Sequence, residues 1–191
     1  MNATSAALIS SMTAIEPRPV VERSDLRSDL ERLHAESWGW ALACCGHDRE
    51  LAQDVLQTAY LTMLSENARF DGRSDFKTWV FGVIRMTARA ETRRGWLWRL
   101  RHRGAENALA LPDPAARADA DPDAPERSAA LVRALATLSP RQREVLQLAF
   151  YHDLTIEEAA RVMKVSVGSA RTHYDRGKKM LARRLAEWRT R

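Results

Sequence analysis

Apolar residues recur along this chain with a helical spacing. In the stretch 47–66, Leu51, Val55 and Ala59 lie four residues apart and form one stripe, as on the buried face of an amphipathic helix. The segment 76–94 has the same period, whereas the strict apolar–polar alternation of a strand is nearly absent. The pattern predicts an all-α protein.

Two breaks interrupt this pattern. The segment 67–75 (NARFDGRSD) contains Asn, Asp and Gly and predicts a turn-rich loop. The segment 111–127 contains four prolines and several acidic residues. Because proline removes a backbone donor and like charges repel, we expect a flexible acidic linker there between two small helical domains, rather than a long surface loop of one domain. The expected division is a flexible N-terminal tail (1–22), a first domain (23–104), the linker (105–128) and a second domain (129–191).

Signals for helix starts organise the second domain. Ser139 precedes Pro140, which favours an N-cap with proline at the first helical position. Thr155 and Glu158 have the spacing of a capping box. After a turn at Lys164, a serine at position 166 is placed to cap one further helix. The second domain is therefore predicted to contain a helix-turn-helix.

The last of these helices is predicted to have an apolar face and an opposite face rich in hydroxyl and basic groups. The expected buried face consists of Val167, Ala170, Tyr174 and Leu181. Hydroxyl and guanidinium groups near the helix start, followed by cations, suit a helix that enters the major groove of DNA, with early residues at base edges and later ones at phosphates. The alternative is a solvated basic face on an ordinary helical hairpin.

Charge is distributed unevenly around a net charge of +5. The segment 85–104 has seven arginines against Glu91 alone, and residues 131–191 have 13 basic against 6 acidic side chains. Residues 1–84 and 105–130 are each net acidic. Two basic segments separated by an acidic one indicate two places at which a polyanion is held.

Three segments resemble the sigma-70 family, specifically the compact two-domain extracytoplasmic-function (ECF) sigma factors. LAQDVLQTAYLTML (51–64) is similar to the helix that docks on the clamp of core RNA polymerase. FDGRSDFKTWVFGVIRMTARAETRR (70–94) resembles the loop and helix that read and open the −10 promoter element. The stretch 138–181, from LSPRQRE to GKKML, is similar to the region that recognises the −35 element. The resemblance covers roughly residues 25–94 and 130–185.

The resemblance implies a division of labour in transcription initiation. Core polymerase supplies the chemistry, so the chain is expected to be no enzyme and to need neither cofactor nor metal. Its implied partners are core RNA polymerase, promoter DNA (duplex at −35, single-stranded at −10) and an anti-sigma factor that holds it inactive. Aromatic faces hold unstacked bases while cations follow the phosphates, which is what strand opening requires.

The implied site residues fall into three groups. Core polymerase is expected to contact Asp54, Gln57, Thr58 and Leu61. The −10 element is expected to contact Asn67, Arg69, Phe70, Asp71, Arg73, Phe76, Lys77, Trp79, Arg85, Arg89 and Arg93. The −35 element is expected to contact Ser166, Gly168, Ser169, Arg171, Thr172, His173, Arg176 and Lys178.

The chain departs from the family pattern at several positions. Lys164 stands where the family usually has the glycine of the turn, and Met86 stands where an asparagine often follows the arginine. His173 and Asp175 replace residues that are more often basic or apolar, which leaves promoter specificity open. The Trp- and Arg-rich segment 95–104 either prolongs the basic helix along upstream DNA or shields apolar surface.

Other functions have less support in the sequence. No Gly-rich phosphate loop and no nucleophile motif is present, which disfavours a nucleotide hydrolase or another hydrolase. The cluster CCGH (44–47), with His34 upstream, offers zinc ligands or an oxidation sensor, but adjacent cysteines serve one tetrahedral site poorly. The main alternative is a DNA-binding regulator with an N-terminal dimerisation or sensor domain. An adaptor that binds only a partner protein would leave both basic segments unexplained.

The remaining features favour the cytoplasm. The first fifteen residues lack the basic start and long apolar core of a secretory signal, and no run approaches the roughly 18 apolar residues of a membrane span. Cys44 and Cys45 are adjacent and cannot frame a disulfide scaffold. We expect a cytoplasmic protein, either free or held at the inner membrane by an anti-sigma factor.

Overall fold

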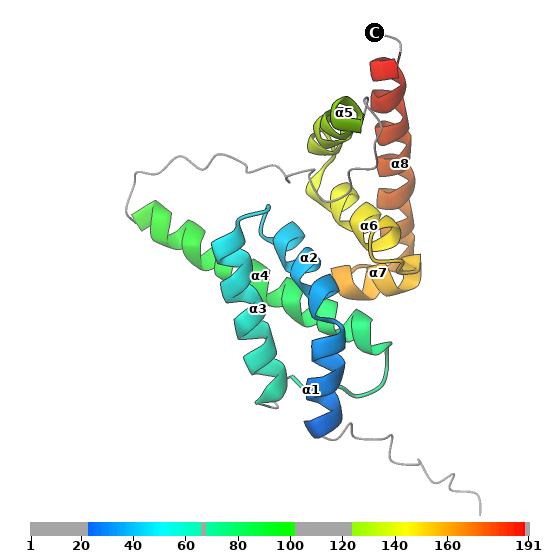
Figure 1. Cartoon of the computed structure of the whole chain (residues 1–191). Coiled ribbons are helices and arrows are strands. Elements are labelled where there is room, and N and C mark those ends of the chain that lie inside the picture. Colours follow the sequence, from blue (N-terminus) through cyan, green and yellow to red (C-terminus); the bar gives the residue numbers. More distant parts are fainter. Residues whose placement is uncertain (1–22, 66–67, 102–123, 190–191) are drawn as a thin grey trace, which may run out of the picture.

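The computed structural model describes residues 23–65, 68–101 and 124–189, and in these ranges every regular element is an α-helix (Figure 1). In chain order the helices are α1 (Arg23–Arg32), α2 (His34–Cys44), α3 (Arg49–Leu64), α4 (Phe76–Arg101), α5 (Ala124–Ala136), α6 (Pro140–Phe150), α7 (Ile156–Met163) and α8 (Val167–Arg189). The predicted all-α class is confirmed. None of these helices is both long and apolar enough to span a bilayer.

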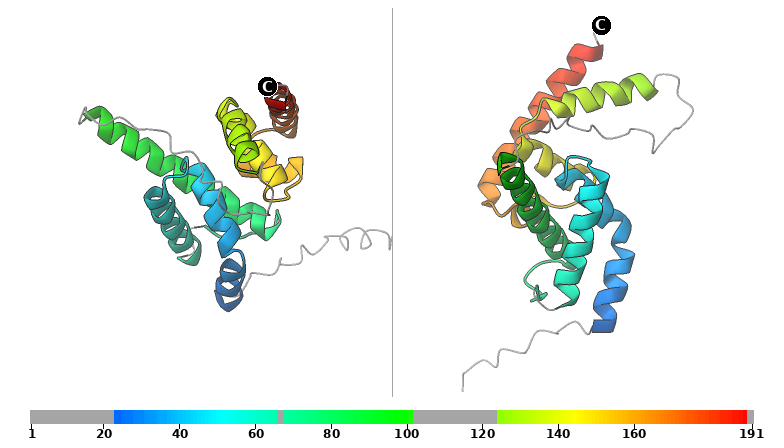
Figure 2. Two further views of the ribbon diagram at one scale, coloured as in Figure 1. Left: turned by 45° about the horizontal axis from the view of Figure 1, so that its top comes forward. Right: turned by 90° about the vertical axis from the view of Figure 1, so that its left-hand side faces the viewer.

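The helices form two groups that meet at α4. In the N-terminal half (α1–α4), helices α2, α3 and α4 pack against one another, and α1 lies beside α2 and α3. In the C-terminal half (α5–α8), the long helix α8 packs along α5, α6 and α7. Helix α7 also lies against α4, and Figures 1 and 2 show this contact from three directions.

Local capping explains where several helices begin. The Asp48 side chain accepts a hydrogen bond from the main-chain N–H of Leu51 at 3.1 Å and caps α3. Helices α6 and α7 both begin with complete capping boxes, in which Ser139 pairs with Gln142 and Thr155 pairs with Glu158. The N-caps that the sequence predicts at positions 139 and 155 are thus confirmed.

The turn between α7 and α8 uses an unusual backbone conformation. Lys164 ends α7 with φ 52° and ψ 51°, in the left-handed region that favours glycine. A non-glycine residue there costs about 1 kcal/mol. The chain therefore keeps the turn of a helix-turn-helix even though it lacks the usual glycine.

Buried residues of both halves form one continuous core. In the N-terminal half Trp40, Val55 and Phe81 are almost completely buried, and in the C-terminal half Leu148 and Met163 are equally inaccessible. The predicted apolar stripe of α3 faces this core. Burial of such side chains is the main stabilising contribution in a helical fold of this size.

One boundary and one buried face differ from the expectations, and the extent of α4 bears on a point that the sequence left open. Helix α5 begins at Ala124, inside the segment 105–128 that was expected to be linker. Helix α4 continues to Arg101, so the backbone of most of the segment 95–104 prolongs the basic helix. Val167 is 40% exposed rather than buried, because it lies in the first turn of α8, before that helix meets its neighbours.

Candidate nucleic-acid interface

The predicted DNA-binding face of α8 is accessible along its first turns. The Ser166 hydroxyl accepts a hydrogen bond from the main-chain N–H of Ser169 at 3.1 Å and caps the helix. The Thr172 hydroxyl donates to the Gly168 carbonyl at 2.9 Å. The structure brings all eight predicted −35 residues together here, and all are exposed except His173, which is half-buried.

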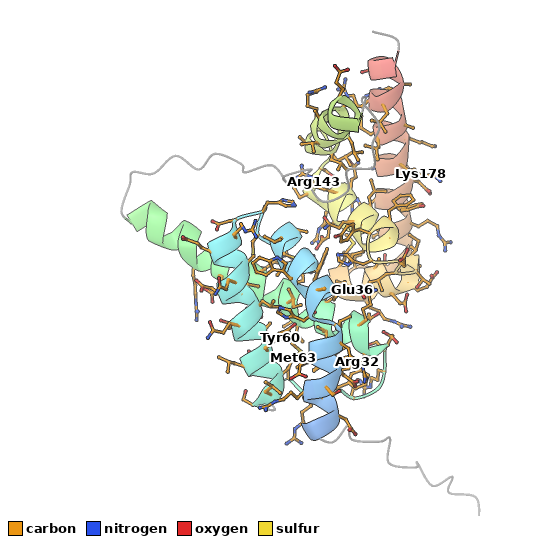
Figure 3. The ribbon with its side chains drawn as sticks, in the orientation of Figure 1. Arg32, Glu36, Tyr60, Met63, Arg143 and Lys178 are labelled. Atoms are coloured by element: carbon orange, nitrogen blue, oxygen red, sulfur yellow. The ribbon has the colours of Figure 1, made fainter. Side chains whose placement is uncertain are left out.

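Arg171, at the start of the second turn of α8, is oriented by a residue of α7. Its Nη2 atom lies 3.3 Å from Oε1 of Glu157, and both side chains are more than half exposed. An exposed pair of this kind contributes little to stability, so its main effect is on the direction of the guanidinium group. Further along the helix, Lys178 points away from the N-terminal half (Figure 3), and its Nζ lies 5.5 Å from the ring centre of Tyr174.

The predicted −10 segment contains a compact cluster of three aromatic rings. Phe70, Phe76 and Trp79 are mutually in contact, with ring centroids 5.4 to 5.6 Å apart. All three residues are half-buried, and Phe76 and Trp79 also pack against the core. Such rings can support the fold and still offer surface for an unstacked base.

Charged groups surround this cluster. Arg69 is exposed in the loop before α4, as are Asp71 and Arg73. Asp71 accepts a hydrogen bond from the main-chain N–H of Arg73 at 3.1 Å, and its other carboxylate oxygen lies 3.1 Å from Arg73 Nε. Lys77 forms an ion pair with Glu36 of α2. Asn67, which was also predicted to contact DNA, lies outside the described residues.

The three predicted DNA-binding arginines of α4 have different environments. Arg89 and Arg93 are exposed. The side chain of Arg85 is only 3% exposed and pairs with Glu144 of α6 through both Nε and Nη2, the latter at 3.2 Å from Oε2. Glu144 also accepts a hydrogen bond from Arg141 at 3.1 Å. With the two halves in contact, Arg85 is therefore inaccessible to DNA. Its assignment to the −10 element stays a prediction that requires the halves to separate.

The residues predicted to bind core polymerase share one accessible face of α3. Asp54, Gln57, Thr58 and Leu61 are all exposed, and the Leu61 side chain is 61% exposed. The opposite face of the same helix is buried in the core through Val55 and its neighbours. An exposed leucine among polar groups suits a protein-binding surface.

Sequence reasoning missed the residues that join the two halves. His152, in the loop between α6 and α7, is 1% exposed and contacts the rings of Phe81 and Trp40 edge-on, at centroid distances of 4.7 and 5.7 Å. Desolvation, followed by the nearby charge of Lys77, lowers the pKa of His152 to about 4, so the ring is neutral at pH 7. Nothing in the local pattern YHDL distinguishes this histidine from an ordinary loop residue.

The two cysteines have environments that oppose reactivity. Burial, with a smaller contribution from Glu144, raises the pKa of Cys44 well above its usual value. Burial and Asp48 raise the pKa of Cys45 to about 12. Because the thiolate is the form that reacts and binds metal, both groups are poor ligands and poor redox sensors at neutral pH. In the described part of the chain no three His, Cys, Asp or Glu residues are arranged to hold a metal ion.

Family models match the two regions of the chain that the resemblance covers. Residues 30–97 match the family model for sigma-70 region 2, and residues 128–181 match the model for sigma-70 region 4. The RNA polymerase sigma factor CarQ of Myxococcus xanthus is 30% identical over 166 residues, which cover 85% of this chain and 91% of CarQ. This chain belongs to the sigma-70 family.

Further similarities support the fold of this family member. The ECF RNA polymerase sigma factor SigX of Bacillus subtilis is 27% identical over 146 residues, 72% of either chain. The sigma factor RpoE of Bartonella quintana, solved with the anti-sigma factor NepR, has a TM-score of 0.66 at 22% identity and covers 85% of this chain and 98% of its own. CnrH, solved with the cytosolic domain of CnrY, has a TM-score of 0.58 at 19% identity over 87% of this chain and 90% of CnrH. These two structures share the fold.

Proposed function

We propose that this sigma-70 family member binds core RNA polymerase and directs promoter-specific initiation of transcription. The observation that carries this proposal is that two chemically distinct surfaces occupy the two family segments. One is the aromatic cluster at the start of α4, and the other is the hydroxyl- and cation-rich face of α8. RNA synthesis itself belongs to the polymerase, so the chain acts in the cytoplasm as a specificity factor and not as an enzyme.

The face of α8 would recognise the −35 element as duplex DNA. Arg171 and the hydroxyl groups in the first turn are placed to reach base edges in the major groove. Arg176 and Lys178, one to two turns later, would contact phosphates. Because phosphate contacts release counterions, the affinity of this face is expected to fall steeply with salt.

The cluster of Phe70, Phe76 and Trp79 would hold bases of the opened −10 strand. Base–aromatic stacking contributes about 1 to 3 kcal/mol per base and tolerates sequence variation. The exposed Arg89 and Arg93 lie further along α4, where they can follow the phosphates. Opening is favoured because these contacts exist only for unstacked bases.

Two protein partners complete the proposal. The α3 face around Leu61 would dock on core polymerase, with one exposed apolar side chain among polar ones. An anti-sigma factor would hold the chain inactive, as suggested by the structurally similar RpoE and CnrH, which were solved with an anti-sigma factor and with the cytosolic domain of CnrY, respectively.

Run-off transcription tests this proposal directly. Purified core RNA polymerase is assayed with and without the chain on sheared DNA of the same host, and start sites are sequenced. Discrete transcripts that need the chain are expected, and upstream alignment of their starts would give the −10 and −35 sequences. Absence of transcripts and of co-elution with core, together with a stable dimer that shifts duplex DNA, would instead establish a conventional regulator.

A further inference from the structure

The two halves are joined by a contact that uses a predicted DNA-binding residue. Arg85 of α4 meets Glu144 of α6, and His152 inserts between α2 and α4 beside Trp40 and Phe81. We call this set of five residues the closing contact. Its members are almost completely buried, apart from Glu144, whose side chain is 18% exposed.

We propose that the closing contact is an autoinhibitory latch in which Glu144 occupies the site on Arg85 that a DNA phosphate takes in the active form. The inference rests on the proposed DNA-binding role of α4. It goes further by assigning an inhibitory role to two residues of the C-terminal half, Glu144 and His152. In this view the closed arrangement and DNA binding through Arg85 are mutually exclusive.

The geometry of the ion pair supports a competition with phosphate. Arg85 presents two nitrogens to the two oxygens of Glu144, the fork-to-fork arrangement that arginine uses for carboxylates and phosphates alike. Arg141 donates a hydrogen bond to Oε2 of the same carboxylate at 3.1 Å, which helps to fix the direction of the Glu144 side chain. Once the halves separate, both charged groups are hydrated again and Arg85 is accessible to a phosphate.

His152 forms the apolar part of the latch. Neither ring nitrogen has a hydrogen-bond partner among the described residues, so the ring fills space as a neutral aromatic group. The charged groups that face it are Lys77 from α4, Glu36 from α2, whose Oε2 lies 4.0 Å from Nδ1, and the adjacent Asp153. Figure 3 labels Glu36 where α2 faces the C-terminal half. A charged imidazole would be desolvated there, so the latch closes on the neutral ring.

Gly39 allows the halves to approach closely. A β-carbon at this position of α2 would lie 3.4 Å from Tyr151 Cε1 and 3.9 Å from His152 Cε1. Any side chain longer than alanine would therefore extend into the space that these two rings occupy. Gly39 offers a way to force the latch open without altering a charge or a residue assigned to DNA.

The test compares four full-length proteins: the unchanged chain, Glu144→Gln, Gly39→Gln, and Glu126→Gln as a charge-matched control on the exposed surface of α5. Small-angle X-ray scattering measures the radius of gyration, and circular dichroism verifies that each variant is folded. Fluorescence anisotropy measures binding of a mixed-sequence single-stranded DNA of about one −10 element in length. Glutamine at position 39 tests the latch even if Glu144→Gln fails to fold.

The latch predicts that Glu144→Gln and Gly39→Gln expand the protein and tighten single-stranded DNA binding, while Glu126→Gln matches the unchanged chain. If the open form is roughly 10% populated beforehand, full opening tightens binding about tenfold. An unchanged radius in both variants would overturn the latch. Expansion without tighter DNA binding would overturn the inhibitory role, and the run-off assay then decides separately whether the proposed function stands.

Discussion

The indole N–H of Trp40 donates a hydrogen bond to the main-chain oxygen of Phe81 at 3.0 Å, and the two rings stack with centroids 5.7 Å apart. This pair ties α2 to α4 inside the N-terminal half. His152 then contacts both rings from the C-terminal half. One aromatic group of three residues thus supports the region 2 fold and receives the other half of the molecule.

Trp40→Phe should weaken the fold. The variant loses the hydrogen bond to Phe81 and leaves part of the indole volume empty, which together cost about 2 kcal/mol of unfolding free energy. Chemical denaturation followed by circular dichroism measures this loss. Trp38→Phe is the matched control, because Trp38 is only half-buried, and an equal loss in both variants would refute the special role of Trp40.

The closing contact should weaken in mild acid. The closed form lowers the pKa of His152 to about 4, below its usual 6.5. The contribution of the neutral ring to closure is therefore complete above pH 6.5 and decreases as the pH falls toward 4. At pH 5.5 closure should have lost about 1 kcal/mol relative to pH 7.5.

His152→Phe isolates this effect. Phenylalanine keeps an aromatic ring in the contact but cannot bind a proton, so the variant should stay compact at pH 5.5 where the unchanged chain expands. Small-angle scattering at pH 7.5 and 5.5 provides the comparison. If the unchanged chain and His152→Phe expanded equally at pH 5.5, groups other than His152 would be responsible for the opening in acid.

Gly177 and Gly82 should respond differently to alanine. A β-carbon at Gly177 of α8 would lie 3.0 Å from Leu146 Cδ1 and 3.1 Å from Gln142 Cβ, whereas Gly82 of α4 has nothing within 4 Å. Gly82→Ala should gain about 0.5 to 1 kcal/mol from helix propensity, and Gly177→Ala should offset that gain by overpacking against α6. Thermal unfolding of both variants measures the difference, and an equal gain would show that α6 can move away without cost.

Trp79→Ala should impair promoter opening more than initial binding. The ring is half-buried beside Phe70 and Phe76, and its accessible part is the surface proposed for an unstacked base. Permanganate footprinting with core polymerase measures the opened strand, and Trp79→Phe controls for loss of packing. An intact footprint in the alanine variant would remove Trp79 from the set of base-contacting residues.

Arg171→Ala should weaken recognition of the −35 element, and Glu157→Gln should do so to a smaller extent. Loss of a base contact typically costs about 1 to 3 kcal/mol, whereas loss of the Glu157 partner only frees the guanidinium to adopt other directions. Once run-off mapping has supplied a promoter, duplex binding with and without its −35 sequence measures both variants. Arg184→Ala, further along α8, is the control for a simple loss of positive charge.

The local features of this fold could be predicted because each depends on a few neighbouring residues. The capping box at Thr155 and the N-cap at Ser139 follow from residues at or near each helix start, and the exposed face of α8 follows from helical periodicity. For Lys164 the sequence showed only that lysine replaces the usual glycine of the turn, and the structure adds the left-handed backbone. The all-α class could be predicted for the same reason, because helical periodicity is a local property of the sequence.

The closing contact could not be predicted, because it joins residues far apart in sequence. Arg85 lies among arginines that suit DNA, and only the presence of Glu144, 59 positions later, shows that it is buried in an ion pair. The sequence around His152 likewise indicates only a loop residue. Its contacts with the rings of Trp40 in α2 and Phe81 in α4 appear only in the structure. Periodicity predicts which face of a helix is buried but not which partner covers it.

Helix α7 has only eight residues, and four of them are buried: Ala159, Ala160, Val162 and Met163. The same short helix supports α8, through which one promoter element would be recognised, and lies against α4, through which the other would be opened. A substitution in α7 can therefore alter both the support of α8 and the contact with α4 that closes the molecule. Sequence variation in this short helix is constrained from two sides.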